Sequence, residues 1–202
     1  MKELLLFLTD KLITAFPALI PVFVFSFFFD RARTKKRWGW LVLYVLYLNA
    51  MLTLVGIPSI SYLRPNAEVN WIPFTDFSQG NLLGMALNVV LFMPLGAFLP
   101  IYFEGFRSPA KTAAAGFGLS LVVELSQLLT FRLTDVDDLI TNTLGTLLGF
   151  LLAKLFISRQ KEILPEQKNA ASFICVTAIV YLTQFLLREP MSGLVYSLPI
   201  FR

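Results

Sequence analysis

Long apolar runs alternate with short polar segments along the whole chain. Each of the six runs is near the length of about 20 residues that an α-helix needs to cross a bilayer. The runs cover residues 8–29, 39–58, 82–103, 112–130, 139–157 and 172–187, of which the last is short. The pattern predicts an all-α integral membrane protein, a bundle of six transmembrane helices that forms a single membrane domain over residues 1–202. It predicts no β-strand.

Lysine and arginine are distributed unevenly among the polar segments. Ten of the 17 basic residues lie in segments 30–37, 104–111 and 158–169, whereas segments 59–80 and 131–138 hold one arginine each. Basic loops remain on the cytoplasmic side of a membrane. We therefore expect the three basic segments on the cytoplasmic side of the membrane, and the two other segments and both chain termini on the outer side.

The segment 59–80 is the longest of the predicted extramembrane loops. It contains several aromatic residues, among them Trp71, Phe74 and Phe77. Tryptophan and tyrosine concentrate at membrane–water interfaces, where part of each ring contacts lipid and part contacts water. We expect this loop to lie in the headgroup region, with Trp71 as an interface anchor.

Composition agrees with the membrane class and excludes several chemistries. Hydrophobic residues make up 56% of the chain, and the mean hydropathy is +0.71. The net charge of +4 comes from basic loops beside the membrane, so anionic lipid headgroups rather than nucleic acid are the expected partners. The chain has no histidine and one cysteine, which excludes His-ligated zinc and thiolate metal cages. No cofactor and no metal site is predicted.

Small and polar residues recur at helical spacing in three of the predicted spans. Residues three, four or seven positions apart share one face of a helix. Three such stripes are Gly116, Ser120, Glu124 and Gln127; Asp138, Asn142, Gly145 and Gly149; and Asn81, Gly84 and Asn88. The spacing of Gly145 and Gly149 is a small-xxx-small pattern, which favours close contact between helices. The stripes predict three helices that pack together through their polar faces.

The depth of these polar groups also agrees. At 1.5 Å per residue, Glu124 lies about 12 Å from Arg132, and Asn142 lies about 6 Å below Asp138. The polar groups are therefore expected to meet in the outer half of the bilayer. A carboxylate in hydrocarbon costs several kcal/mol unless it faces the bundle interior or finds partners. Glu124 is for that reason a candidate functional residue.

The segment 131–138 adds three carboxylates and one guanidinium to this region. We expect Arg132 to pair with Asp135, Asp138 or Glu124 and to keep them ionised. Any single Asn or Gln in these spans could have a purely structural role, in which its hydrogen bond joins two helices and contributes about 1 kcal/mol. The combination of Glu124, Arg132 and Asp138 favours a functional role, because stability alone is obtained from apolar packing. Asp137 is expected to be a solvated loop residue.

Four motifs follow one another between residues 66 and 155. They are Asn70-Trp-Ile-Pro73-Phe74, Asn88-Val-Val-Leu-Phe92-Met-Pro94-Leu-Gly96, Glu124-Leu-Ser-Gln127 and Arg132-Leu-Thr-Asp135-Val-Asp137-Asp138-Leu-Ile-Thr-Asn142-Thr-Leu-Gly145. In this order and spacing they resemble the VanZ-like family of teicoplanin-resistance membrane proteins, with a core at residues 66–155. The resemblance implies a small bacterial plasma-membrane protein of Gram-positive type that modulates susceptibility to lipoglycopeptides. The polar signature of the family maps onto Asn88, Glu124, Gln127, Arg132, Asp135, Asp138 and Asn142.

Three functions are compatible with this pattern. The first is a non-catalytic, outward-facing site that binds a lipidated antibiotic or a cell-wall lipid through Arg132 and the carboxylates. This hypothesis predicts that the lipid tail of the ligand contacts Trp71, Phe74, Phe77, Met85, Phe92 and Phe131. The second is an enzyme that modifies an envelope lipid or lipid-linked polymer, with Glu124 or Asp138 as general base and Arg132 holding an anionic group. The third is a lipid transporter or scramblase, which the absence of an inverted repeat disfavours.

Overall fold

A computed structural model describes most of the chain and confirms the all-α fold. The described residues are 17–25, 27, 35–65, 68–130, 134–157 and 170–197. After a helical stretch at residues 17–25, the long helices are α2 (Lys35–Val55), α3 (Gln79–Tyr102), α4 (Pro109–Gln127), α5 (Val136–Ile157) and α6 (Ala170–Ser197). Two short 3-10 helices (Ile60–Tyr62 and Glu104–Phe106) and two short strands, β1 (Val69–Asn70) and β2 (Thr134–Asp135), lie between them.

Four segments in the described ranges are long and apolar enough to cross a membrane. They are Trp38–Tyr62, Gln79–Tyr102, Val136–Leu155 and Ala171–Met191. The run 112–130 is also helical, as α4, but its small and polar residues make it less apolar than these four. The run 8–29 lies largely outside the described residues, so the number of six spans stays a prediction. The last run was predicted to cover residues 172–187. This prediction was too short, since α6 continues to Ser197.

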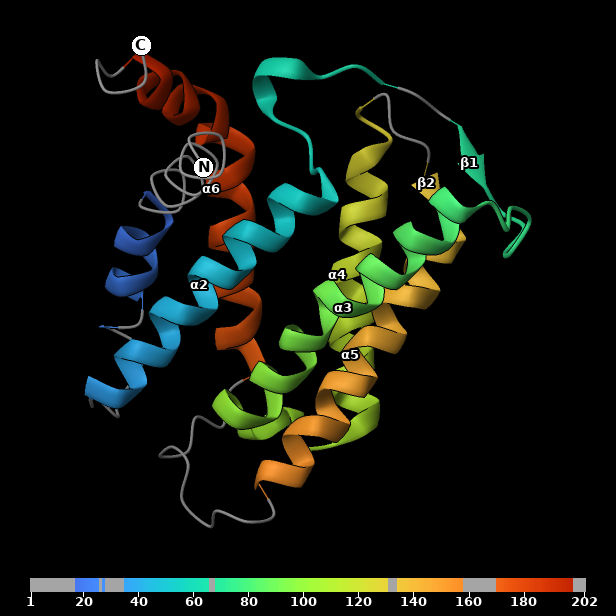
Figure 1. Cartoon of the computed structure of the whole chain (residues 1–202). Helices are drawn as coiled ribbons and strands as arrows, with labels where there is room; N and C mark the ends of the chain where they lie inside the picture. Colours follow the sequence, from blue (N-terminus) through green and yellow to red (C-terminus); the bar gives the residue numbers. More distant parts are fainter. Residues whose placement is uncertain are drawn as a thin grey trace. The chain divides into compact units, whose positions relative to one another are not determined.

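The chain divides into two compact units. The first comprises Met1–Leu63 and Ala171–Arg202, and therefore contains α2 and α6. The second, Arg64–Ala170, contains α3, α4, α5 and both strands (Figure 1). The predicted core at residues 66–155 falls within this second unit. The candidate functional site belongs to this second unit.

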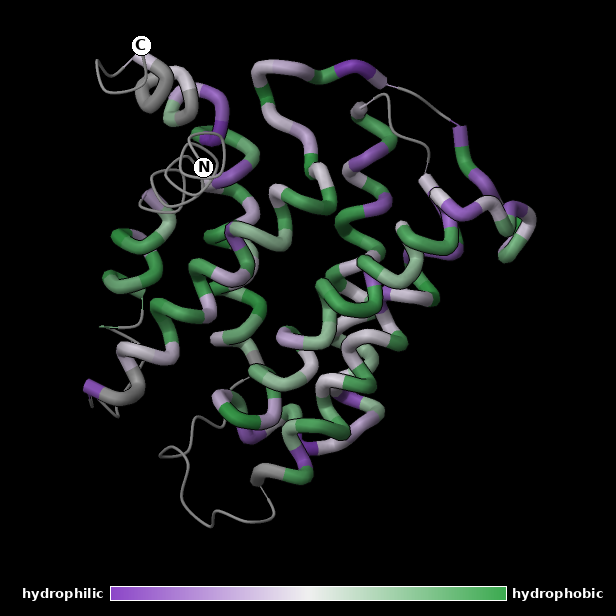
Figure 2. The backbone as a smooth tube through the Cα atoms, viewed as in Figure 1, coloured by the Kyte–Doolittle hydropathy of each residue, from purple (hydrophilic) through white to green (hydrophobic). Residues whose placement is uncertain are grey.

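In the second unit, α4 ends on the side where α3 and α5 begin (Figure 1). We call this the polar end; Gln79, Gln127 and Val136 mark it. Here β1 pairs with β2 in parallel, with Val69 opposite Thr134 and Asn70 opposite Asp135. Hydrophilic residues gather around this strand pair, whereas hydrophobic residues dominate the helices (Figure 2). The prediction of no strand was wrong, because two-residue strands are too short to produce a periodic pattern.

Glycines allow α3 and α5 to touch backbone to backbone. A Cβ added at Gly145 would collide with the Val89 carbonyl group, and one at Gly149 would collide with the carbonyl group of Met93. From the other helix, a Cβ at Gly96 would collide with the backbone of Thr146. The predicted small-xxx-small contact is therefore confirmed, and each of its two glycines lies against a carbonyl of α3.

The stripe predicted on α3 is wrong in part. Gly84 is exposed, and a Cβ there would meet no atom within 4 Å, so it is not a contact between helices. Asn81 takes part in the start of the helix, since its backbone N–H donates to the Ser78 hydroxyl (3.4 Å) and its Nδ2 to the Asp76 carbonyl (2.7 Å). Only Asn88 of this stripe reaches the interior of the unit.

Replacing Gly149 by Ala should destabilise the protein, because the added methyl group needs space that the α3 backbone occupies. Overpacking of this kind costs about 1–3 kcal/mol. The apparent melting temperature of the purified protein in detergent would fall. Gly118→Ala is the matched control, since a Cβ at Gly118 of α4 meets nothing within 4 Å. Equal melting temperatures for the two variants would contradict the close contact.

Candidate functional site

Residues of α4 and α5 face one another in successive pairs. A Cβ at Gly116 would meet the side chain of Thr146. One turn further along α4, Ser120 Oγ accepts a hydrogen bond from Asn142 Nδ2 at 2.9 Å. Each step moves four residues forward in α4 and four residues back in α5, as expected for antiparallel helices with i, i+4 faces. All four residues are buried.

One more step of this register brings Glu124 to the level of Asp138. Glu124 is only 2% exposed, so its carboxylate lies inside the unit and does not face lipid. Its Oε2 accepts the backbone N–H of Asp135 at 3.1 Å. Its own backbone carbonyl accepts the hydroxyl of Thr134 at 3.2 Å. The β2 strand thus provides hydrogen bonds to both the side chain and the main chain of Glu124.

Asp138 connects the third helix to this group. Its Oδ1 accepts a hydrogen bond from Asn88 Nδ2 at 2.7 Å. Asn88 lies on α3 and Asp138 in the first turn of α5, so the bond joins the two helices above their glycine contacts. Three of the predicted site residues, Asn88, Glu124 and Asp138, therefore come to the polar end from three different helices.

Asp135 links the loop before α3 to the start of α5. Asn70 Nδ2 donates to both carboxylate oxygens of Asp135, at 3.3 Å each. Oδ1 of Asp135 also accepts the backbone N–H of Asp137 at 2.9 Å. The Asp135 backbone N–H meanwhile holds Glu124. This one residue therefore contributes to three connections at the polar end.

The prediction that Asp137 is a solvated loop residue was wrong. The residue is 2% exposed, and its Oδ1 accepts the backbone N–H of Phe74 at 2.9 Å. The other oxygen, Oδ2, is buried without a hydrogen-bond partner among the described residues. The error arose because α5 begins at Val136, three residues before the predicted span. Asp137 therefore lies in the first turn of a helix, where the helix dipole stabilises carboxylates.

Two other residues of the predicted site are also placed by the structure. Gln127 is buried on the same face of α4 as Glu124, and Asn142 is buried one turn below Asp138. Arg132 lies outside the described residues, so its pairing with the carboxylates stays a prediction. No group of three or more acidic or cysteine residues in the described ranges is placed to hold a metal ion.

The aromatic residues predicted at the site differ in their exposure. Trp71, Phe74 and Phe77 are exposed on the loop between β1 and α3. Phe92 is fully buried in the core, so its prediction as a tail contact was wrong. It lies on the inner face of α3, and sequence spacing alone does not distinguish the inner face from the outer one. Met85 is half-buried, and Phe131 lies outside the described residues.

The first unit contains polar contacts that the sequence analysis did not select. Gln184 Nε2 of α6 donates a hydrogen bond to Asn49 Oδ1 of α2, and both residues are buried. The hydroxyls of Tyr44 and Thr177 lie 3.2 Å apart between the same helices. A single Asn or Gln in an apolar run is the signal that could have identified this pair, because such residues bond across helices in membranes.

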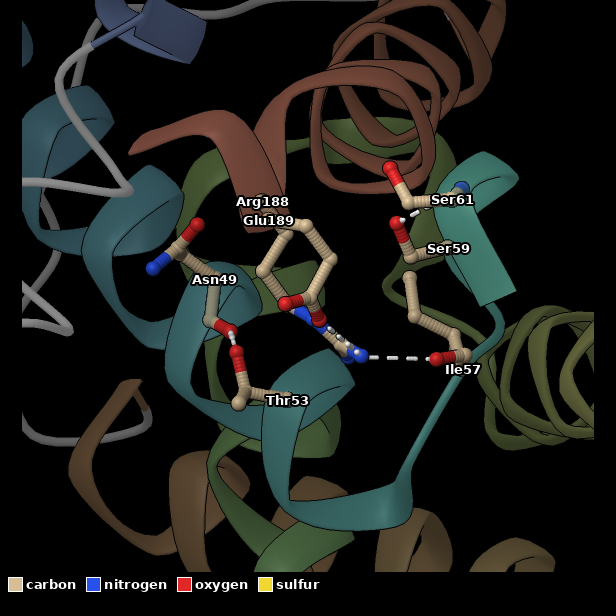
Figure 3. A network of polar contacts seen from close by, with 7 residues as sticks. All are labelled: Asn49, Thr53, Ile57, Ser59, Ser61, Arg188 and Glu189. Atoms are coloured by element: carbon tan, nitrogen blue, oxygen red, sulfur yellow. Dashed lines mark hydrogen bonds and ion pairs between the residues drawn. The ribbon is translucent and has the colours of Figure 1, made fainter. Parts of the chain in front are cut away.

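A second group of contacts in this unit surrounds the end of α2. Arg188 Nη1 donates to the backbone carbonyl of Ile57 at 3.1 Å, and its Nη2 lies 3.2 Å from Glu189 Oε1 (Figure 3). The chain leaves α2 through Gly56, which has a left-handed φ of 76°. The guanidinium thus satisfies a carbonyl just beyond the last helical turn, where intrahelical partners are missing. These contacts explain the end of the helix without requiring a ligand.

Removing the Asp137 carboxylate should release the loop that contains Phe74. Asp137→Ala deletes the acceptor of the Phe74 N–H, and loss of such a buried partner costs about 1–3 kcal/mol. Backbone amides of residues 71–77 should then exchange with deuterium roughly tenfold faster, since 1.4 kcal/mol corresponds to a factor of ten. Mass spectrometry of the protein in nanodiscs measures this rate. Asp137→Asn keeps an acceptor oxygen and should exchange slowly; the same rate in both variants would contradict the role of this bond.

Comparisons with known proteins agree with the motifs in this site. The sequence model of the family described as VanZ/LLP1 matches residues 40–157, which include every described residue of the site. The chain is also 32% identical over 148 residues to Protein VanZ of Enterococcus faecium, an alignment that covers 73% of this chain and 82% of that protein. No solved structure matches the chain. The predicted family resemblance is confirmed, and the chain belongs to the VanZ/LLP1 family.

Proposed function

We propose that this protein modulates susceptibility to teicoplanin-type lipoglycopeptide antibiotics through a polar intramembrane site that binds a lipid-like ligand. The observation that carries the proposal is the burial of Glu124 at the level of Asp138, where α3, α4, α5 and β2 meet. The relationship to Protein VanZ supports an association with teicoplanin resistance. The proposed site faces outward, as the distribution of basic loops predicts.

The energetic cost of this arrangement favours a binding role. Taking carboxylates out of water costs several kcal/mol each unless charges and hydrogen bonds compensate. Four acidic residues, Glu124, Asp135, Asp137 and Asp138, lie at one end of a unit in which α3 and α5 touch through glycines. Apolar residues of the same size would join these helices at lower cost. Recognition of a polar group is a reason to retain the acids.

The position of the site suits a ligand with a polar head and a lipid tail. Its carboxylates connect directly to the loop between β1 and α3, through Asn70 bound to Asp135 and through the Phe74 N–H bound to Asp137. The same loop exposes aromatic side chains. A ligand that partitions into the bilayer could therefore bring its head to the carboxylates while its tail remains among lipids. Candidate ligands are the lipidated antibiotic itself or a cell-wall lipid.

A second candidate function is an enzyme that modifies an envelope lipid or a lipid-linked polymer. The register that sets Glu124 opposite Asp138 favours it, because a general acid and a general base are often two carboxylates whose environments differ. Glu124 is buried and receives a backbone N–H, whereas Asp138 is half-buried and receives the amide of Asn88. Under this alternative the protein would change a lipid covalently and would not only bind it.

The variant Glu124→Gln tests the proposed site. It removes the buried charge while nearly preserving the volume of the side chain. Since a hydrogen bond to a charged group contributes about 1.5–3 kcal/mol, we expect photo-crosslinking of a lipidated teicoplanin probe to require roughly tenfold more probe. The minimal inhibitory concentration of teicoplanin should fall to that of cells without the protein. Glu104→Gln, at the connection between α3 and α4, is the matched control and should behave as wild type.

The two candidate functions predict different results for the same variant. Unchanged resistance in Glu124→Gln would contradict a role for the buried carboxylate in either function. Lost resistance with unchanged crosslinking would show that binding alone is insufficient. In that case, mass spectrometry of envelope lipids from cells with and without the protein should reveal a changed species, as the enzymatic alternative requires.

A further inference from the structure

The loop between β1 and α3 exposes large apolar side chains. Trp71 is 75% exposed, Ile72 67% and Phe77 66%. The exposed polar residues Ser78 and Gln79 follow, and further along α3 the side chains of Leu82, Leu83, Leu87 and Val90 are again exposed. Because Gln79–Tyr102 is apolar and long enough to cross a membrane, we expect lipid to cover this exposed side of α3. The loop lies directly before the first residue of that helix.

Hydrogen bonds tie this loop to β2 and to the first turn of α5. Asn70 donates to Asp135, and the N–H of Phe74 donates to Asp137. Nearer to α3, Asp76 accepts hydrogen bonds from the N–H and the hydroxyl of Ser78. The loop is thus held by the carboxylates of Asp135 and Asp137, while the side chains of Trp71, Ile72 and Phe77 stay exposed. A loop fixed in this way does not need to reorganise before it contacts lipid.

Phe74 shows how the loop is kept in this shape. Its φ of 58° is in the left-handed region, which a bulky residue seldom adopts. Such a conformation costs about 1–3 kcal/mol and persists only when neighbouring groups stabilise it. The hydrogen bond from the Phe74 N–H to Asp137 is one such stabilising contact. Trp71 and Phe77, the aromatic residues on either side of this turn, are both exposed.

We propose that this loop is a membrane-interface anchor, in which Trp71, Ile72 and Phe77 insert between the headgroups and upper acyl chains of the leaflet at the polar end. The helix that follows the loop directly, Gln79–Tyr102, is apolar and long enough to cross a membrane, and this identifies bilayer lipid as the occupant. Residues 68–102 contain no lysine or arginine, so insertion depends on aromatic and apolar contact and not on attraction to anionic headgroups. The loop is joined to the carboxylate site by the hydrogen bonds of Asn70 to Asp135 and of the Phe74 N–H to Asp137.

This inference does not rest on the proposed function, because bilayer lipid should cover the loop when no antibiotic or cell-wall lipid is bound. The chain has three tryptophans, at positions 38, 40 and 71, so Trp38→Phe with Trp40→Phe leaves Trp71 as the single fluorophore. The double variant is reconstituted in ligand-free phosphatidylcholine vesicles. The lipids are brominated either near the top of the acyl chains or near their ends.

We expect the emission of Trp71 to be shifted to the blue relative to tryptophan in water. Bromine near the top of the acyl chains should remove roughly half of its intensity, and bromine near the chain ends should remove less, because interfacial aromatic rings lie at headgroup depth. Iodide in the aqueous phase should quench the fluorescence of Trp71 only weakly. If the double variant does not fold, the difference between the wild-type spectrum and that of Trp71→Phe provides the same signal.

Two outcomes would overturn the proposal. Strong quenching by iodide, without quenching by brominated lipid, would place the loop in water. Protection from both quenchers would mean that protein covers it, and crosslinking between copies of the chain would then identify a second copy as the occupant. Quenching by brominated lipid only when a lipidated teicoplanin is added would also contradict the proposal, since lipid contact would then depend on the ligand.

Discussion

The structure of the second unit depends on one constraint, which is that a carboxylate buried in a helical membrane protein needs hydrogen-bond donors. Glu124 is on a helix, so its own helix cannot provide them, because the N–H groups there bond to carbonyls four residues earlier. One donor is the backbone N–H of Asp135, in the short strand β2 directly before α5. The strand β2 therefore does more than connect two helices.

That strand is itself held by the loop that precedes α3. Pairing of β1 with β2 and the bonds from Asn70 to Asp135 bring together segments that are 65 residues apart in sequence. Irregular backbone at the end of a bundle is tolerated where its polar groups are satisfied by protein. The loop before α3, the strand pair and the first turn of α5 consequently form one hydrogen-bonded layer over the polar end.

Close contact between α3 and α5 sets the geometry beneath this layer. The glycines of α5 touch the carbonyls of α3 directly, which leaves no room for side chains between the two backbones. With the helices this near, the short side chain of Asn88 can reach Asp138 at 2.7 Å. The first unit uses a different solution, since its helices are joined by a hydrogen bond between Asn49 and Gln184 and by Arg188 at the end of α2.

The sequence by itself determined the helical spans of the described core, the stripe of α4 that faces inward, the glycine contact of α5 and the family. These follow from periodicity within one helix and from motif order, both of which are local properties. Only the tertiary structure decided that β1 pairs with β2, that Asp137 is buried and that Phe92 lies in the core. Each of these depends on contacts between distant segments, and a one-dimensional pattern does not specify which partner a polar atom or an apolar face will meet.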